Sequence, residues 1–390
     1  MKKTLSFLLF AALLTALLAA CGGASPDAET PSPEEPPEPS AEREAPGVMR
    51  GVTTMELVHE MGIGVNLGNT MEAVGGETSW GSPPVTEAMI AGYAAAGFSS
   101  VRIPVAWSTQ MDEDGYGIYA DRMDRVQQIT DWVLDHGMTA VVNIHWDGGW
   151  WEAFPTDKDR CMAKYKAIWT QIAERFKNYG DKLIFESANE ELGWDSLWNR
   201  WSGSADGKDE YYGLTNEVNQ VFVDLVRASG GNNGLRHLLI AGPATDVELT
   251  CDPMFLVPND PQNRCAVSVH YYTPSTFAIL AEDASWGKMR PTWGTERDFG
   301  ELNRLMDMVK TAFIDKGVPV VVGEFGAEKK NKEPGMVPLY IRSVCEAVYT
   351  RGMCPMLWDT PGSSFYDRLL HTFDPVLEEA FAGIKTLPRE

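Results

Sequence analysis

Basic side chains are few in this chain of 390 residues. There are 33 Lys and Arg residues against 55 Asp and Glu residues, which gives a formal net charge of −22 at pH 7. A surface of that charge repels nucleic acid and other anionic polymers. We therefore expect no nucleic-acid partner and a neutral substrate.

Cysteine is also rare, and its pattern excludes two kinds of scaffold. Six Cys residues occur in the chain, and an odd number remains when Cys21 is set aside. An odd number without close CxxC spacing argues against a disulfide framework and against a zinc site. Cys251 and Cys265 flank one short loop and could form a disulfide. Free and partly buried thiols are the simpler expectation for the whole set: Cys161, Cys251, Cys265, Cys345 and Cys354.

The apolar run at the start of the chain is too short to span a membrane. It extends from Leu5 to Ala20, follows Lys2 and Lys3, and ends in small residues, which is typical of a secretory signal. Residues 18–21 (LAAC) resemble a bacterial lipobox. That resemblance implies cleavage before Cys21, acylation of its thiol, and an extracellular protein anchored to the cell membrane by lipid. Ordinary secretion with a chance cysteine is the alternative.

Large apolar side chains are almost absent from residues 21–48, which are rich in Pro, Glu, Ser and Ala. Such a segment cannot bury a core, so we expect a disordered acidic tether after the signal peptide of residues 1–20. Residues 49–390 show no second low-complexity break and no internal repeat. One large domain therefore fits this part better than two.

Short apolar segments alternate with amphipathic helical segments along residues 49–390. Eight of them are predicted strands: 61–69, 100–105, 139–145, 183–191, 237–242, 266–272, 318–326 and 354–359. This alternation predicts an α/β fold, a (β/α)8 or TIM barrel, with active-site residues where strands pass into loops. An open doubly wound sheet also alternates, but it offers one crevice only. Polar or aromatic residues mark nearly every strand end, which favours a closed barrel: Asn66, Arg102, His145, Asn189, Glu190, His270, Tyr272, Glu324 and Trp358.

Two of these strand-end residues are glutamates. Glu190 ends one predicted strand and Glu324 ends another, far downstream. In one closed parallel sheet, both carboxyl groups can converge across the mouth. Acetal hydrolysis needs such a pair, because one carboxyl group protonates the leaving oxygen while the other stabilises or attacks the anomeric carbon. A salt bridge within a loop is the structural alternative for each.

Seven short motifs stand at the predicted strand ends, in this order: 64–73 (GVNLGNTMEA), 101–104 (VRIP), 143–145 (NIH), 185–190 (FESANE), 270–272 (HYY), 323–326 (GEFG) and 357–358 (LW). Together they resemble glycoside hydrolase family 5, the retaining cellulase family of clan A. The opening motif, taken with residues 77–81 (ETSWG), is similar to the fourth subfamily. That subfamily contains endoglucanases, xyloglucanases, lichenases and some xylanases.

The resemblance implies a role for each matching residue. Glu190 corresponds to the general acid/base and Glu324 to the nucleophile. The other matching active-site positions are Arg102, His145, Asn189, His270, Tyr272 and Trp358, and Asn66 is a further supporting residue. Two positions depart from the family pattern, because Trp146 follows His145 where a second His is frequent, and Glu191 follows Glu190 where Pro is common. Both departures leave the catalytic positions intact.

Physical chemistry suggests what the supporting residues do. Arg102 and Tyr272 are expected to donate hydrogen bonds to Glu324 and keep it ionised, although Arg102 could belong to a purely structural ion pair. Asn189 is expected to bind the sugar 2-hydroxyl. His145 and His270 could bind hydroxyl groups, modulate the acid, or be core histidines. No third residue has a spacing that suits a metal ion, so neither a metal nor a cofactor is expected.

Tryptophan is plentiful, with 13 residues in the chain, and aromatic faces stack on neutral sugars. Trp358 is the expected platform beneath the sugar at the cleavage point. Several others lie in loops on the presumed active face, and some of these are expected to be packing residues: Trp80, Trp146, Trp150, Trp151, Trp194, Trp198, Trp201, Trp286 and Trp293. Of these, Trp80, Trp146, Trp151 and Trp293 are predicted to contact substrate.

The sequence therefore predicts a monomeric, membrane-tethered, extracellular endo-β-1,4-glucanase that acts on neutral β-glucan with net retention. A xyloglucanase or mixed-linkage glucanase with the same site is the alternative among enzymes. A non-catalytic surface lipoprotein that binds glycans is the alternative from another class, and the presence of both glutamates argues against it.

Overall fold

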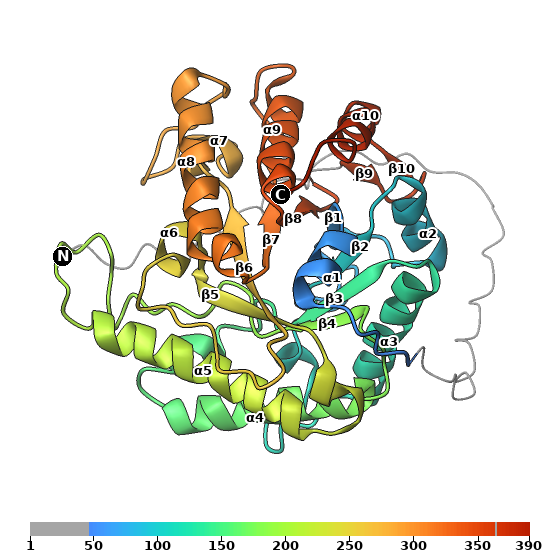
Figure 1. Cartoon of the computed structure of the whole chain (residues 1–390), viewed down its shortest axis with the longest axis vertical. Helices are drawn as coiled ribbons and strands as arrows, with labels where there is room; N and C mark the ends of the chain where they lie inside the picture. Colours follow the sequence, from blue (N-terminus) through green and yellow to red (C-terminus); the bar gives the residue numbers. More distant parts are fainter. Residues whose placement is uncertain (1–46, 363–364) are drawn as a thin grey trace, which may run out of the picture. The chain divides into compact units, whose positions relative to one another are not determined.

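Eight parallel strands form a closed barrel in which each strand pairs with its neighbours in chain order and β8 pairs with β1. The structure is a computed structural model that describes residues 47–362 and 365–390 (Figure 1). The strands are β1 (Gly64–Leu67), β2 (Ser100–Ile103), β3 (Thr139–Asn143), β4 (Leu183–Glu186), β5 (Leu238–Asp246), β6 (Cys265–Tyr271), β7 (Val320–Phe325) and β8 (Cys354–Asp359). The prediction of a (β/α)8 barrel is confirmed.

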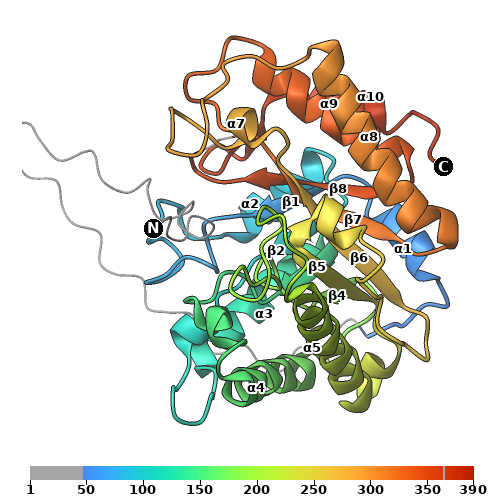
Figure 2. The ribbon, with the colours of Figure 1, turned by 90° about the vertical axis from the view of Figure 1, so that its left-hand side faces the viewer.

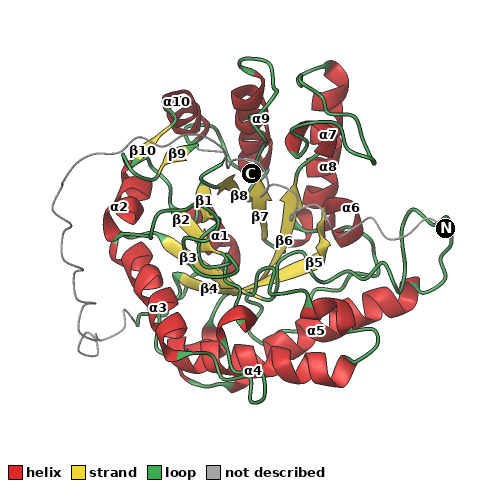
Figure 3. Cartoon of the chain, turned by 180° about the vertical axis from the view of Figure 1, so that it is seen from behind, coloured by secondary structure: helices red, strands yellow, loops and turns green. Residues whose placement is uncertain are grey.

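Helices surround the barrel as an outer layer (Figure 3). The long ones are α2 (Glu87–Ala95), α3 (Ala120–Asp135), α4 (Lys158–Phe176), α5 (Lys208–Ala228), α8 (Glu296–Ala312), α9 (Met336–Thr350) and α10 (Pro375–Ile384). Two single-turn helices, α6 (Val247–Thr250) and α7 (Ser275–Ala278), lie in the segments that follow β5 and β6. The sequence did not predict the two-stranded hairpin of β9 (Tyr366–Asp367) and β10 (Thr372–Phe373), whose strands are too short to show a period. Among the described residues, no helix combines the length and apolar character needed to cross a membrane.

A short entry helix, α1 (Thr54–Glu60), lies at one end of the barrel (Figure 2). It begins with a capping box in which the Thr53 hydroxyl accepts from the Glu56 backbone N–H, while the Glu56 carboxylate accepts from Thr53. Its apolar residues Leu57 and Val58 pack with buried residues that β3 to β8 contribute. This end of the barrel is therefore filled with apolar side chains, and the opposite end is left for polar ones.

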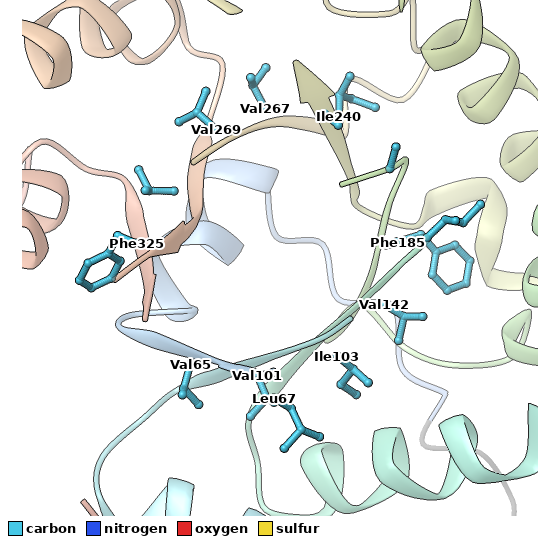
Figure 4. Packing of buried hydrophobic residues seen from close by; sticks show 14 of the residues in the cluster. Val65, Leu67, Val101, Ile103, Val142, Phe185, Ile240, Val267, Val269 and Phe325 are labelled. Carbon is cyan, nitrogen blue, oxygen red and sulfur yellow. The ribbon is translucent and has the colours of Figure 1, made fainter. Parts of the chain in front are cut away.

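The period of two along each strand decides which side chains enter the barrel. Figure 4 shows Phe185 and Phe325 on the outer side of their strands, toward the helices, and Phe185 contacts Trp169 of α4. Because neighbouring residues of a strand point to opposite faces, Glu186 and Glu324 then point inward. The same alternation sends Val101 and Ile103 outward and Arg102 inward. The apolar residues that face the helices thus fix which polar side chains of the strands point into the barrel.

The five cysteines of the barrel are free, as expected, and Cys251 and Cys265 form no disulfide. The signal peptide, the lipidation site at Cys21 and nearly all of the acidic tether lie outside the described residues, so all three remain predictions. Residues 363 and 364, in the segment after β8, also lie outside them.

Candidate active site

The carboxylate of Glu324 lies at the end of β7 and receives hydrogen bonds on both oxygens. Arg102 Nη1 donates to Oε1 over 2.7 Å, and the Tyr272 hydroxyl donates to Oε2 over 2.9 Å. Gly323 precedes Glu324, and a Cβ atom at that position would stand 3.0 Å from Ser268 Oγ and 3.2 Å from His270 Nε2. The glycine therefore lets β6 and β7 approach closely where Glu324 and His270 meet.

Arg102 is wholly buried, and each of its three nitrogens donates to a neighbour. Nε donates to Glu186 Oε2 over 2.6 Å, and Nη2 donates to Asn189 Oδ1 over 2.9 Å. A buried guanidinium must be neutralised, and here two carboxylates, from Glu186 and Glu324, do so. The expected contact between Arg102 and Glu324 is present. The purely structural ion pair also exists, with Glu186 as its partner.

Two further residues anchor this network to the strands. Asn66 Oδ1 accepts from Arg102 Nη1 over 3.0 Å, and Asn66 Nδ2 donates to the Gly323 carbonyl over 2.8 Å. Ser268 donates to the second oxygen of Glu186 over 2.7 Å. Asn66 is fully buried, so it supports Arg102.

Glu190 and Glu324 approach each other across the mouth, with His270 between them. His270 Nδ1 lies 2.8 Å from Glu190 Oε1 and 3.7 Å from Glu324 Oε2. One oxygen of each carboxyl group and this nitrogen all lie within 4.8 Å of one another. The environments differ, because the side chain of Glu190 is 41% exposed and that of Glu324 only 4%. The pairing that the sequence predicted is therefore present.

The same three residues are also, among the described residues, a group whose ligand atoms lie close enough together for a metal ion. Sequence spacing did not suggest such a group, because its members come from three distant segments of the chain. The hydrogen bond between His270 and Glu190 accounts for much of their closeness.

Burial and nearby charges set the protonation of the site. Burial raises the pKa of Glu324, and the neighbouring side chains of His270 and Arg102 oppose that rise. Burial, together with the negative charges of Glu324 and Glu190, holds the pKa of Tyr272 well above its usual value. Tyr272 therefore keeps its proton and can donate a hydrogen bond to Glu324. Burial and the charge of Arg102 hold the pKa of His145 well below its usual value, so this ring stays neutral.

The aromatic residues divide into exposed and buried groups. Trp358 lies near the end of β8, as predicted. The His145 ring stacks on it, with ring centroids 5.7 Å apart and ring planes 7° apart. His145 thus supports Trp358. Trp146 is exposed and Trp80 is half-buried, so both remain candidates for contact with substrate.

Two tryptophan predictions are wrong. Trp151 is only 2% exposed and packs in a cluster with Trp150, Phe154 and Tyr165. Trp293 is only 3% exposed and packs edge-on against Tyr340 and Phe299. Trp151 lies in a short 3-10 helix, η2 (Trp150–Ala153), and Trp293 lies in a loop. Contacts with aromatic residues of the surrounding helices bury both side chains.

Sequence reasoning also missed two buried carboxyl groups. Glu186 forms an ion pair with Arg102, as Glu324 does. The sequence signal for it was its position directly after Phe185, because the neighbour of an outward-facing strand residue points inward. Glu191 is buried, and its Oε2 accepts from the Asn189 backbone N–H over 3.1 Å. Burial, followed by the charge of Glu190, raises the pKa of Glu191 to about 8.

This elevated pKa predicts that Glu191→Gln changes the pH dependence of stability. The folded pKa lies above the unfolded value of about 4.3, so the stabilisation from protonated Glu191 is complete below that value and is lost as pH rises through about 8. Glutamine keeps the acceptor oxygen without the titration. We expect the free energy of unfolding of the variant, relative to that of wild type, to rise by about 4 kcal/mol from pH 5 to pH 9. Urea unfolding at each pH measures it. A constant difference across that range would contradict the assignment.

This chain is similar to known proteins in both sequence and structure. The sequence model Cellulase (glycosyl hydrolase family 5) matches residues 66–362. Endoglucanase B of Clostridium cellulovorans is 37% identical over 312 residues, which cover 80% of this chain and 69% of that protein.

Two solved structures are also similar. A Bacteroides ovatus GH5 xyloglucanase in complex with a XXXG heptasaccharide has a TM-score of 0.79 and 32% identity, covering 88% of this chain and 79% of that one. A mutant GH5 lichenase from Caldicellulosiruptor sp. F32 in complex with cellotetraose has a TM-score of 0.77 and 31% identity, covering 89% and 99%. Because the family match extends from β1 past the end of β8, and with it the whole polar mouth of the barrel, the chain belongs to glycosyl hydrolase family 5, the cellulase family.

Proposed function

We propose that this protein is an endo-β-1,4-glucanase that hydrolyses internal bonds of plant cell-wall β-glucans by double displacement. Glu324 is the proposed nucleophile and Glu190 the proposed general acid/base. The observation that supports this proposal best is the separation of the two carboxyl groups, which bring one oxygen each to within 4.8 Å. Retaining glycosidases hold their carboxyl groups roughly 5 to 5.5 Å apart, whereas inverting enzymes need about 6.5 to 9.5 Å to admit a water molecule.

In the first step, Glu324 attacks the anomeric carbon while Glu190 gives its proton to the leaving oxygen. The glycosidic bond breaks, the leaving chain departs as an alcohol, and the sugar becomes an ester of Glu324. In the second step, Glu190 removes a proton from water while the water oxygen attacks the anomeric carbon, and the ester bond to Glu324 breaks. Two inversions at one carbon give net retention, and both carboxyl groups return to their starting states.

The hydrogen bonds around Glu324 fit a nucleophile that must stay ionised and aimed. Arg102 and Tyr272 occupy one position each on its two oxygens. The partial exposure of Glu190 leaves it accessible to a leaving group and to water. Asn189 accepts from Arg102 through Oδ1, which orients the amide and leaves Nδ2 to donate to a sugar hydroxyl. His270 lies within hydrogen-bond distance of Glu190, so it can orient the carboxyl group of the acid/base.

The names of similar proteins suggest which glucans to test. They include a xyloglucanase in complex with a XXXG heptasaccharide and a mutant lichenase in complex with cellotetraose. We therefore propose a neutral β-glucan as substrate, with xyloglucanase or mixed-linkage glucanase activity as the second candidate.

Initial rates on carboxymethylcellulose, lichenan, xyloglucan, xylan and mannan test the proposal. We expect reducing ends to appear on at least one of the three glucans, with a rapid fall in viscosity that marks internal cleavage. Binding of a glucan without any release of reducing ends would favour the non-catalytic glycan-binding lipoprotein instead.

We also propose that the enzyme acts outside the cell, held to the membrane by a lipid on Cys21. The support is the lipobox-like sequence of residues 18–21, followed by an acidic segment poor in apolar residues. In fractionated cells, activity should sediment with membranes, and Cys21→Ser should move it to the soluble fraction. Soluble activity in the unmodified protein would refute the anchor.

A further inference from the structure

Trp201 has the largest exposed fraction of any large apolar side chain in the described part of the chain, at 81%. It lies in the segment between β4 and α5, which also contains Glu190. A tryptophan can bury roughly 150 to 250 Å² when it packs, so an exposed ring forgoes a large stabilisation. Its neighbour Trp198 instead packs against Tyr211 and Tyr212. Core packing does not explain why Trp201 is a tryptophan.

Local contacts hold this exposed ring in place. The Trp201 backbone N–H donates to Asn199 Oδ1 over 2.8 Å, and the Arg200 guanidinium lies 4.8 Å from the centroid of the Trp201 ring. Arg200 is itself fixed, because it donates to Asp246 over 2.7 Å and to Glu248 over 3.1 Å. A cation over an aromatic face restrains its orientation. Trp201 is thus both exposed and oriented, which reduces the entropy lost when a ligand binds.

The same contacts place Trp201 beside the mouth of the barrel. Asp246 is the last residue of β5 and pairs with His270 in the register between β5 and β6. His270 in turn lies 2.8 Å from Glu190. Trp201 therefore belongs to the rim on the Glu190 side. In the proposed reaction, that is the side on which the leaving sugar chain departs.

We propose that Trp201 is a binding platform for the glucan units on the leaving-group side of the cleaved bond. The apolar face of a glucose ring stacks on an aromatic face, and a neutral chain suits an otherwise acidic protein. This inference rests on the proposed function, because it takes the side of the acid from the role of Glu190.

The test compares a substrate that carries sugar units on the leaving side with one that carries none there. Mixed-linkage glucan places sugar units on both sides of the cleaved bond, whereas an aryl β-cellobioside places only an aryl group on the leaving side. Trp201→Ala should lower kcat/KM on the glucan about five- to tenfold, the range expected for one aromatic stacking contact. It should leave the aryl cellobioside unchanged, and Trp201→Phe should restore most of the loss. Transfer of glycosyl units to added cellobiose should also fall, because the acceptor occupies the same side.

Leu256→Ala serves as the matched control. This side chain is 59% exposed and lies between α6 and the start of β6, away from the barrel mouth. We expect no change on either substrate. Equal loss on both substrates in Trp201→Ala would mean a structural role, and no loss on glucan would mean no platform, so either result overturns the inference. Wild-type protein inactive on both substrates would instead refute the proposed function.

Discussion

Replacing Glu324 by Ala should abolish hydrolysis of every glucan and aryl glycoside while leaving the fold intact. Without the carboxylate there is no covalent intermediate, and we expect kcat to fall by about 10⁴-fold or more. The fold should survive because Arg102 keeps its ion pair with Glu186, which leaves one buried positive charge against one negative charge. Circular dichroism and the melting temperature check the fold, and release of reducing sugar or aryl alcohol checks the activity.

Azide makes this prediction sharper. A small anion can occupy the space that Glu324 leaves and attack an activated β-glycoside directly, so a single displacement gives the α-glycosyl azide. Glu333→Ala is the matched control, since it removes an exposed carboxylate from the segment that follows β7. Near-wild-type activity in Glu324→Ala, or loss of activity in the control alone, would contradict the assignment.

Replacing Glu190 by Ala should have an effect that depends on the leaving group. The sugar chain released from a polysaccharide is a poor leaving group and needs a proton from Glu190, so kcat/KM on glucan should fall by about 10² to 10⁴-fold. A dinitrophenyl cellobioside needs little assistance, so its first step should be largely spared. Its second step lacks the base, and the ester on Glu324 should accumulate, with a burst of aryl alcohol followed by slow turnover.

Azide again gives a distinct product. It needs no general base, so it should restore turnover of the dinitrophenyl substrate in Glu190→Ala by attacking the ester. Two displacements then yield the β-glycosyl azide, opposite to the product from Glu324→Ala. Equal losses on polysaccharide and on the activated substrate would rule out the role of Glu190 as an acid.

Strand periodicity explains how much of this site the sequence could predict. Phe185 and Phe325 face the helices, so their neighbours Glu186 and Glu324 must face inward. The strand-end positions of Glu190 and His270 then follow from the closed parallel sheet, whose carboxyl ends meet at one mouth. The need of Arg102 for a buried partner was also visible in the sequence.

Other features depend on contacts that no local pattern contains. Glu186 was missed because the predicted strand, residues 183–191, contains a more prominent carboxyl residue near its end, Glu190. Trp151 and Trp293 were predicted to lie on the active face, yet both are buried by aromatic partners from α4 and α9. The exposure of Trp201 beside the buried Trp194 in the same loop shows that loop position alone does not separate a packing residue from an accessible one.

The stereochemical course of hydrolysis tests double displacement most directly. Proton NMR of a cello-oligosaccharide digest, recorded before mutarotation, should show the β-anomer of the new reducing end first, because two inversions restore the starting configuration. The α-anomer appearing first would mean a single displacement by water, and a pair of carboxyl groups this close together would then have been assigned the wrong chemistry.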